Sequence, residues 1–371
     1  MNRFSVRFSL AALFVGLVAL LATGCGSSDE AEAGAKKLSF TLTDEGCDPH
    51  NAETPAGPVS IEVENGGSAS VTELEVLDGE TIVGEVENLT EGLSGNFSLN
   101  LEKGEYTLRC NGGSDEDGTL TLTGGAKAKA GPETEAAIAQ YRRYLEQNTG
   151  ELVAKTVPFA AAVEAGEVER AKSLYPAARI PYERIEPVAE SFGDLDPRID
   201  ARANDVPPNE FGGFHRIEKA LWAEGTTHGM APIATQLLAD TEELRQKVKV
   251  VDLQAVQIAN GANELLGEVS ASKITGEEER YSHTDLVDFK ANVEGAEAAF
   301  EAVEPLLSKD DPKLAREIEA SFDDVYDSLQ PYERGDGFVS YTKLSKADTR
   351  KLAQEIDALA ELLAQVPAQI V

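Results

Sequence analysis

The sequence is poor in the residue types on which most enzyme and metal sites depend. It has three cysteines, four histidines, two methionines and one tryptophan in 371 residues. No second cysteine lies near Cys47 or Cys110, which excludes a CxxC zinc knuckle. The chain has no GxSxG nucleophile elbow and no Walker loop, and Lys219 stands where an HExxH peptidase needs its second histidine. Hydrolysis therefore lacks a visible nucleophile or base constellation, and only a metal-bound water remains as its route.

Basic residues are also scarce. The chain has 33 Lys and Arg against 66 Asp and Glu, a net charge of -33. Phosphate binding needs basic patches, so this balance excludes nucleic acid as a partner. It suits cations, basic partners, or an acidic surface that only confers solubility. Apolar residues make up 42% of the chain, which is enough for folded cores.

A basic and then hydrophobic start indicates export. Arg3 and Arg7 precede an apolar run, Leu10 to Leu21, that is short for a membrane span and typical of a signal peptide. It ends in "LATGC", which resembles a bacterial lipobox although Ala22 replaces the more usual Leu. We expect a lipoprotein signal peptide at 1–25, acylation of Cys25, and a solvated tether at 26–37. A plain signal peptide is the alternative, and both interpretations place the protein in the cell envelope.

Residues 38–124 alternate between apolar and polar side chains, in short runs such as "VSIEVEN" and "GTLTLTG" that Gly, Asn and Asp separate. This period of two predicts an antiparallel β-sandwich of about seven strands. Cys47 and Cys110 lie in this region, and an oxidising compartment permits them to pair.

After a linker at 125–132 the period changes to that of helices. Stripes such as "PIATQLLADTEELRQKVKVV" predict an all-α bundle of six to eight helices over residues 133–371. Pro132 suits a first helical turn. Prolines 176, 181 and 187 should kink or segment the stretch that contains them.

Carboxylates and histidines gather at helical spacing in this second half. "GGFHRIEKALW" places His215 and Glu218 three residues apart and therefore on one helix face. Gly212 and Gly213 permit a close backbone approach at the start of that helix. Helix bundles build metal sites from such pairs, and one imidazole with several carboxylates suits iron, manganese, calcium or zinc. The alternative is an ordinary solvent-facing hydrogen bond.

Further acidic groups are spread along the helical half. They are Glu183 and Glu186, then Asp194, Asp196, Asp200 and Asp205, and finally Glu277, Glu278, Glu279, His283 and Asp285. For His283 and Asp285 the alternative role is in a helix N-terminus, where Thr284 or Asp285 would cap the run that follows.

"GFHRIEKALW" resembles the GxHxxE motif of imelysin-like domains, a group once classed as metallopeptidases. The stretches Lys172–Arg202 and Ala271–Ala296 resemble the same domain of the EfeO-type family. That resemblance implies an exported iron-binding protein that takes ferrous or ferric iron, with an EfeU-type permease and an EfeB-type haem peroxidase as partners. It implies the metal ligands His215, Glu218, Glu183, Glu186, Asp200 and Glu278.

The first half is similar to the cupredoxin-like domain of that family. The resemblance implies a second metal site, for copper, zinc or iron, at Cys47, Glu73 and Cys110. Blue-copper chemistry is excluded because the domain has a single histidine, His50, and no methionine between residues 26 and 130. Thr107 stands where some relatives have an acidic residue. A disulfide between the two cysteines remains the alternative.

Three functions follow from these observations. The first is the capture of iron at the His and carboxylate site and its delivery to the permease, without catalysis. The second is a metal-dependent peptidase of imelysin type, in which Glu218 acts as the base for a metal-bound water. The third is a polysaccharide- or surface-binding module whose acidic residues are only solvated.

Overall fold

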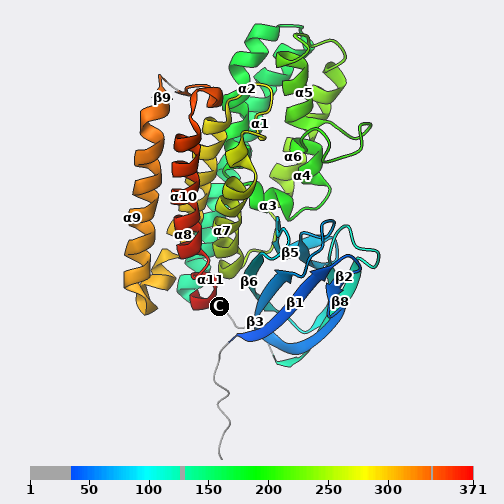
Figure 1. The fold of residues 1–371 in the computed structure, drawn as a ribbon, viewed down its shortest axis with the longest axis vertical. Coiled ribbons are helices and arrows are strands. Elements are labelled where there is room, and N and C mark those ends of the chain that lie inside the picture. The colour runs from blue at the N-terminus through cyan, green and yellow to red at the C-terminus, as the bar shows by residue number, and fades with distance from the viewer. Residues whose placement is uncertain (1–34, 126–129, 336, 371) are drawn as a thin grey trace, which may run out of the picture. The chain divides into compact units, whose positions relative to one another are not determined.

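The computed structural model describes residues 35–125, 130–335 and 337–370. Within them a β-region extends from Lys36 to Gly125, and a helical region extends from Pro132 to Ile370 (Figure 1). The predicted signal peptide with Cys25, most of the predicted tether and residues 126–129 of the linker lie outside the described residues. The first strand begins at Lys36, so the last two residues of the predicted tether belong to that strand.

The β-region is a mixed-sheet sandwich. Its strands are β1 (Lys36–Thr43), β2 (Gly46–Asp48), β3 (Asn51–Asn65), β4 (Leu74–Asp78), β5 (Thr81–Val86), β6 (Ser94–Leu101), β7 (Gly104–Arg109) and β8 (Asp117–Gly125). Strand β3 belongs to two sheets. Its first part pairs with β8 and its second part pairs with β1 and β6, with a bulge between Pro55 and Ala56. Alternate residues of the strands meet in one apolar core, which includes Leu42, Ile61 and Leu120.

The prediction of purely antiparallel pairing was wrong. β1 and β3 are parallel, and so are β3 and β8, whereas the other pairs are antiparallel. The three-residue β2 runs back along β1, and a second reversal then sends β3 in the direction of β1. Alternation in a sequence reports which side chains are buried, but it carries no information on strand direction.

The helical region contains more helices than predicted, because several are short. They are α1 (Pro132–Glu164), α2 (Val168–Glu183), α3 (Glu186–Glu190), α4 (Leu195–Asp200), α5 (Gly213–Trp222), α6 (Ala231–Val248), α7 (Ala255–Ala271), α8 (Asp285–Asp310), α9 (Pro312–Leu329), α10 (Lys346–Leu363) and α11 (Pro367–Ile370). A 3₁₀ turn, η1 (Lys273–Thr275), follows α7, and a small hairpin pairs β9 (Glu333–Arg334) with β10 (Gly337–Phe338). Long helices α8, α9 and α10 lie side by side (Figure 1).

Proline positions explain the break between α2 and α3. Pro132 occupies the first turn of α1, as predicted. Pro176 and Pro181 lie inside α2, which ends at Glu183, and Pro187 is in the first turn of α3. The predicted segmentation of this stretch is therefore confirmed, and it turns the chain so that Glu183 and Glu186 enter the core from two different helices.

Aromatic side chains fix α5 against α1 and α2. The rings of Phe159 and Phe214 lie 6.0 Å apart, and those of Tyr175 and Trp222 lie 5.4 Å apart edge to face. Such pairs stabilise by about 0.5–1.5 kcal/mol beyond the burial of their area. They hold the helix that carries His215 in a defined orientation.

Candidate metal centre

A group of buried carboxylates surrounds His215 in the helical core. Each of the seven lies within 4.0 Å of Arg179, Lys273 or His215. They are Glu183, Glu186, Asp200, Glu218, Glu278, Glu279 and Asp288. Buried carboxylates are rare in proteins unless they are paired or bind a cation. We refer to these seven carboxylates with His215, Arg179 and Lys273 as the inner centre.

The two ring nitrogens of His215 face different carboxylates. Nε2 lies 3.2 Å from Glu278 Oε1 and 3.6 Å from Asp200 Oδ1. Nδ1 lies 3.5 Å from Glu218 Oε2. One metal ion bound at Nε2 would therefore share Asp200 and Glu278, whereas Glu218 would set the tautomer and tilt of the ring from its other side.

Asp200, His215 and Glu278 satisfy the geometry of a metal site. One ligand atom from each of the three residues lies within 4.8 Å of the other two, and all three residues are buried. Glu183 and Glu186 satisfy the same condition with Asp200. Asp200 therefore belongs to both groups, which form one continuous set of oxygen donors and one nitrogen donor.

Gly213 brings α5 into contact with α4. Its φ is +63°, and a Cβ at this position would lie 2.0 Å from the carbonyl oxygen of Ile199. Asp200 is the next residue after Ile199, and His215 follows Gly213 by two residues. The close backbone approach predicted for this glycine thus places the two candidate ligands beside each other.

Backbone amides hold Glu218 in place. Its Oε1 accepts hydrogen bonds from the N–H groups of Tyr281 and Ser282, at 2.8 and 2.7 Å. Its Oε2 makes no hydrogen bond among the described residues and faces the imidazole. Glu218 is completely buried. This side chain connects α5 to the loop that carries Glu278.

Arg179 lies in the middle of the carboxylates and is completely buried. Its guanidinium contacts Glu183 and Asp200 closely, and it lies 2.8 Å from Glu278 and 2.7 Å from Glu279. It also lies over the Phe214 ring, 5.6 Å from its centroid. The guanidinium therefore neutralises part of the charge that a metal ion would otherwise neutralise.

Lys273 plays the same part on the other side of Glu183. Its completely buried ammonium lies 3.1 Å from Glu183, 2.5 Å from Glu186 and 3.2 Å from Glu268. The amide of Asn292 donates to the Glu183 and Glu186 carboxylates at 3.2 and 3.1 Å. These donors hold both glutamates in place.

The environment separates the carboxylates into two classes. Burial by itself would raise the pKa of Glu278, but Lys273, His215 and Arg179 outweigh it and hold that pKa well below its usual range. In Asp200 and Glu218, too, the pKa is lowered, because neighbouring cations or hydrogen-bond donors outweigh burial. Burial instead raises the pKa of Glu279 and Asp288 well above the ordinary value. The carboxylates nearest His215 are thus the ionised ones, as cation binding requires.

The structure brings all six residues of the predicted ligand set into the inner centre, and it leaves several other candidates outside. Glu277 pairs with Arg280 and Asp205 pairs with Arg202, both at exposed positions, while Asp194 pairs with Arg198. Asp285 begins α8 and accepts a hydrogen bond from the amide of Glu279. His283 has a φ of 58° in the preceding loop.

Sequence reasoning missed the cations. Neither Arg179 nor Lys273 was predicted to belong to the site, and Asp288 was missed as well. One signal existed for Arg179, which precedes Glu183 by four residues and so shares its helix face. No local signal marks Lys273, because its partners lie more than 80 residues away in sequence, apart from Glu268.

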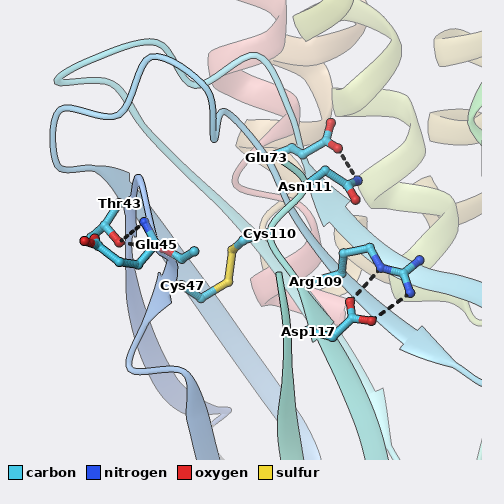
Figure 2. The surroundings of a disulfide bond; sticks show 9 residues. Thr43, Glu45, Cys47, Glu73, Arg109, Cys110, Asn111 and Asp117 are labelled. Atoms are coloured by element: carbon cyan, nitrogen blue, oxygen red, sulfur yellow. Dashed lines mark hydrogen bonds and ion pairs between the residues drawn. A yellow bond between two sulfur atoms is a disulfide. The ribbon is translucent and has the colours of Figure 1, made fainter. Parts of the chain in front are cut away.

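In the β-region, the structure joins Cys47 and Cys110 by a disulfide, with a Cα–Cα distance of 5.8 Å (Figure 2). In this form neither sulfur is a thiolate, the form that binds metal ions. The Glu73 carboxylate accepts a hydrogen bond from the Asn111 amide, as Figure 2 shows. The disulfide alternative thus describes this state, and a metal at Cys47, Glu73 and Cys110 would require reduction first.

Comparison with known proteins agrees with both halves. Residues 137–366 match the imelysin family, and residues 15–122 match the cupredoxin-like domain family. The chain is 39% identical to the iron uptake system component EfeO of Escherichia coli strain K12 in an alignment of 374 positions that covers 98% of this chain and 97% of that protein. The chain belongs to the EfeO family. This EfeO-family chain is also 39% identical to the EfeO proteins of E. coli O6:K15:H31 and Shigella flexneri, again over 98% of its length and 98% and 97% of theirs.

Among the described residues of this EfeO-family protein, no helix is both long and apolar enough to cross a membrane. Cys25, the predicted lipidation site, lies outside those residues.

Proposed function

We propose that this protein captures iron in the cell envelope at the inner centre and delivers it to a membrane permease, without catalysing a reaction. The observation that carries the proposal is the buried group of Asp200, His215 and Glu278, whose ligand atoms lie within 4.8 Å of one another. Relatives of nearly full length that are named iron uptake system components support the choice of iron.

In this proposal His215, Asp200 and Glu278 bind the iron first, and Glu183 and Glu186 complete the shell from the side of Lys273. Glu218 orients the imidazole, and the Glu218 carboxylate stays ionised. Oxygen donors with one imidazole suit both ferrous and ferric iron. Loading requires the ion to displace the Arg179 guanidinium from Asp200 or Glu278, which makes binding reversible and therefore suited to transfer.

The proposal includes the surroundings of the protein. Cys25 would carry a lipid anchor, an EfeU-type permease would receive the iron, and an EfeB-type haem peroxidase would act with it. Similarity to an iron uptake system component supports the two partners, and the lipobox in the sequence supports the anchor.

The test is anaerobic titration calorimetry of the metal-free protein with ferrous iron. His215→Ala and Glu278→Gln are expected to weaken binding at least tenfold. His228→Ala is the matched control, because that histidine is exposed and lies outside the inner centre. Equal affinity for all four proteins would refute the proposed site.

Peptidase assays of the metal-loaded protein should detect no cleavage, and cleavage that His215→Ala abolishes would favour the enzyme instead.

A further inference from the structure

A second acidic site lies between the strands and the helices. A cavity of about 660 Å³ is bordered by β5, β6, α3, α7 and α10. No Lys, Arg or His occurs among the described residues that line it. Its acidic lining residues are Glu85, Glu87, Glu190, Glu264, Glu268, Asp357 and Glu361.

Hydrogen bonds join the two walls of this cavity. The Gln257 amide on α7 donates to the carbonyl of Val83 in β5 at 2.9 Å, and the Asn260 amide donates to the carbonyl of Ser98 in β6 at 2.8 Å. Glu264 and Glu268 follow on the same face of α7, at helical spacing. The carboxylates of both walls are therefore held opposite one another.

Glu85 is buried, so it is not one of the solvated carboxylates of an acidic surface. It is only 7% exposed, and its carboxylate makes no hydrogen bond or ion pair to any described residue, yet it lines the cavity. In the pairing of β4 with β5 it lies directly opposite Glu75. Like charges at opposed positions destabilise a sheet, so Glu85 has an unfavourable position unless something neutralises it.

Glu75 already has partners, and Glu85 does not share them. The amide of Asn111 donates to Glu75 at 2.7 Å, and Arg109 lies 4.0 Å from it. Burial, with Glu87 and Glu264 next in effect, raises the pKa of Glu85 well above its usual value. Burial also raises the pKa of Glu264 to about 8. Both carboxylates lack a compensating cation.

We propose that this cavity binds a hard divalent cation, of the Ca²⁺ and Mn²⁺ class, through Glu85 from the strands and Glu264 from α7. Glu87, Glu190 and Glu268 complete the acidic wall. Carboxylate oxygens without nitrogen or sulfur donors favour this class of cation over softer metals. A water molecule takes about 30 Å³, so a cavity of about 660 Å³ accommodates the ion with much of its hydration shell.

The cavity site is distinct from the inner centre. The two sites adjoin, because the Lys273 ammonium lies 2.5 Å from Glu186 and 3.2 Å from Glu268, and ligand atoms of Glu186, Glu190 and Glu268 lie within 4.8 Å of one another. The proposed cavity ligands Glu85 and Glu264 are not part of the inner centre. The inner centre offers an imidazole, and the cavity offers oxygen alone. The cavity site therefore does not depend on the capture of iron at His215.

The test is titration of the full chain with Mn²⁺, with free Mn²⁺ measured by electron paramagnetic resonance. The double variant Glu85→Gln with Glu264→Gln should weaken Mn²⁺ binding at the cavity site at least tenfold and leave binding at the inner centre intact. His215→Ala should do the reverse. The matched control is Glu319→Gln with Asp324→Asn, which removes two exposed carboxylates from α9, a helix that does not line the cavity.

Thermal unfolding gives a second measurement that does not depend on Mn²⁺ stoichiometry. Without cations and at a pH above the raised pKa values of both groups, about 8 for Glu264, the Glu85→Gln and Glu264→Gln variant should unfold at a higher temperature than the parent, because two uncompensated charges are gone. Added Ca²⁺ should raise the unfolding temperature of the parent more than that of this variant. The proposal would be overturned if the Glu85→Gln and Glu264→Gln variant bound Mn²⁺ as the parent and the α9 control do. If only His215→Ala has no effect, the proposed iron site fails while the cavity site stands.

Discussion

The buried guanidinium of Arg179 gives the sharpest prediction. Replacing it by glutamine leaves Glu183, Asp200, Glu278 and Glu279 without their shared cation in a position that is completely buried. Removing one partner of a buried ion pair costs about 3–5 kcal/mol. For a helical region of this size, that loss lowers the unfolding temperature by roughly 6–20 °C.

A bound metal ion should restore much of this loss in Arg179→Gln. The ion no longer competes with the guanidinium for Asp200 and Glu278, so the same metal concentration should stabilise the variant more than the parent. At one hundred times the dissociation constant, a ligand adds about 2.7 kcal/mol to the free energy of unfolding.

Urea unfolding followed by circular dichroism at 222 nm, with and without ferrous iron under anaerobic conditions, measures both effects. Arg316→Gln is the matched control, because Arg316 is an exposed arginine on α9. If Arg179→Gln unfolds within about 1 kcal/mol of the parent without metal, the guanidinium is not the counterion that the reasoning requires. Equal stabilisation of both proteins by iron would refute the idea of competition.

Three further predictions concern other positions. Gly213→Ala should lower the free energy of unfolding by more than about 2 kcal/mol and weaken iron binding, because a Cβ would lie 2.0 Å from the Ile199 carbonyl oxygen; calorimetry that finds parental affinity would contradict this. Asn65→Ala should destabilise the sandwich by about 2–4 kcal/mol in urea, since its buried amide donates to the carbonyls of Ser68 and Leu89 at 2.9 and 2.6 Å. Serine at both Cys47 and Cys110 opens a loop of 63 residues and should cost the sandwich about 2–5 kcal/mol, while iron binding at the inner centre stays unchanged.

The sequence predicted which residues share a face of one helix or strand better than it predicted which faces pack together. Helical spacing placed His215 with Glu218 on one face, and proline positions marked the end of α2. Glu278 approaches His215 across 63 residues, and only the resemblance to a known family suggested that pair. Periodicity determines which side chains share a face, but packing decides which faces come together.

The same limit explains the errors in the sandwich and in the charges. Alternation identified the strands but not the parallel course of β1 and β3. Completely buried Arg179 and Lys273 look like surface residues in a sequence, because charged side chains are rarely buried. Their role depends on carboxylates that arrive from α2, α3, α4, α7, α8 and the loop before α8.

The two buried cations also bear on the design of metal proteins. A transplant that copied only the imidazole and the carboxylates into another helical scaffold would place several negative charges in a core, and such a scaffold would fold only around its metal. A transplant that kept Arg179 and Lys273 would fold first and take up its metal afterwards. Whether a centre of this kind is assembled by its cargo or waits for it is thus decided by residues that a list of ligands omits.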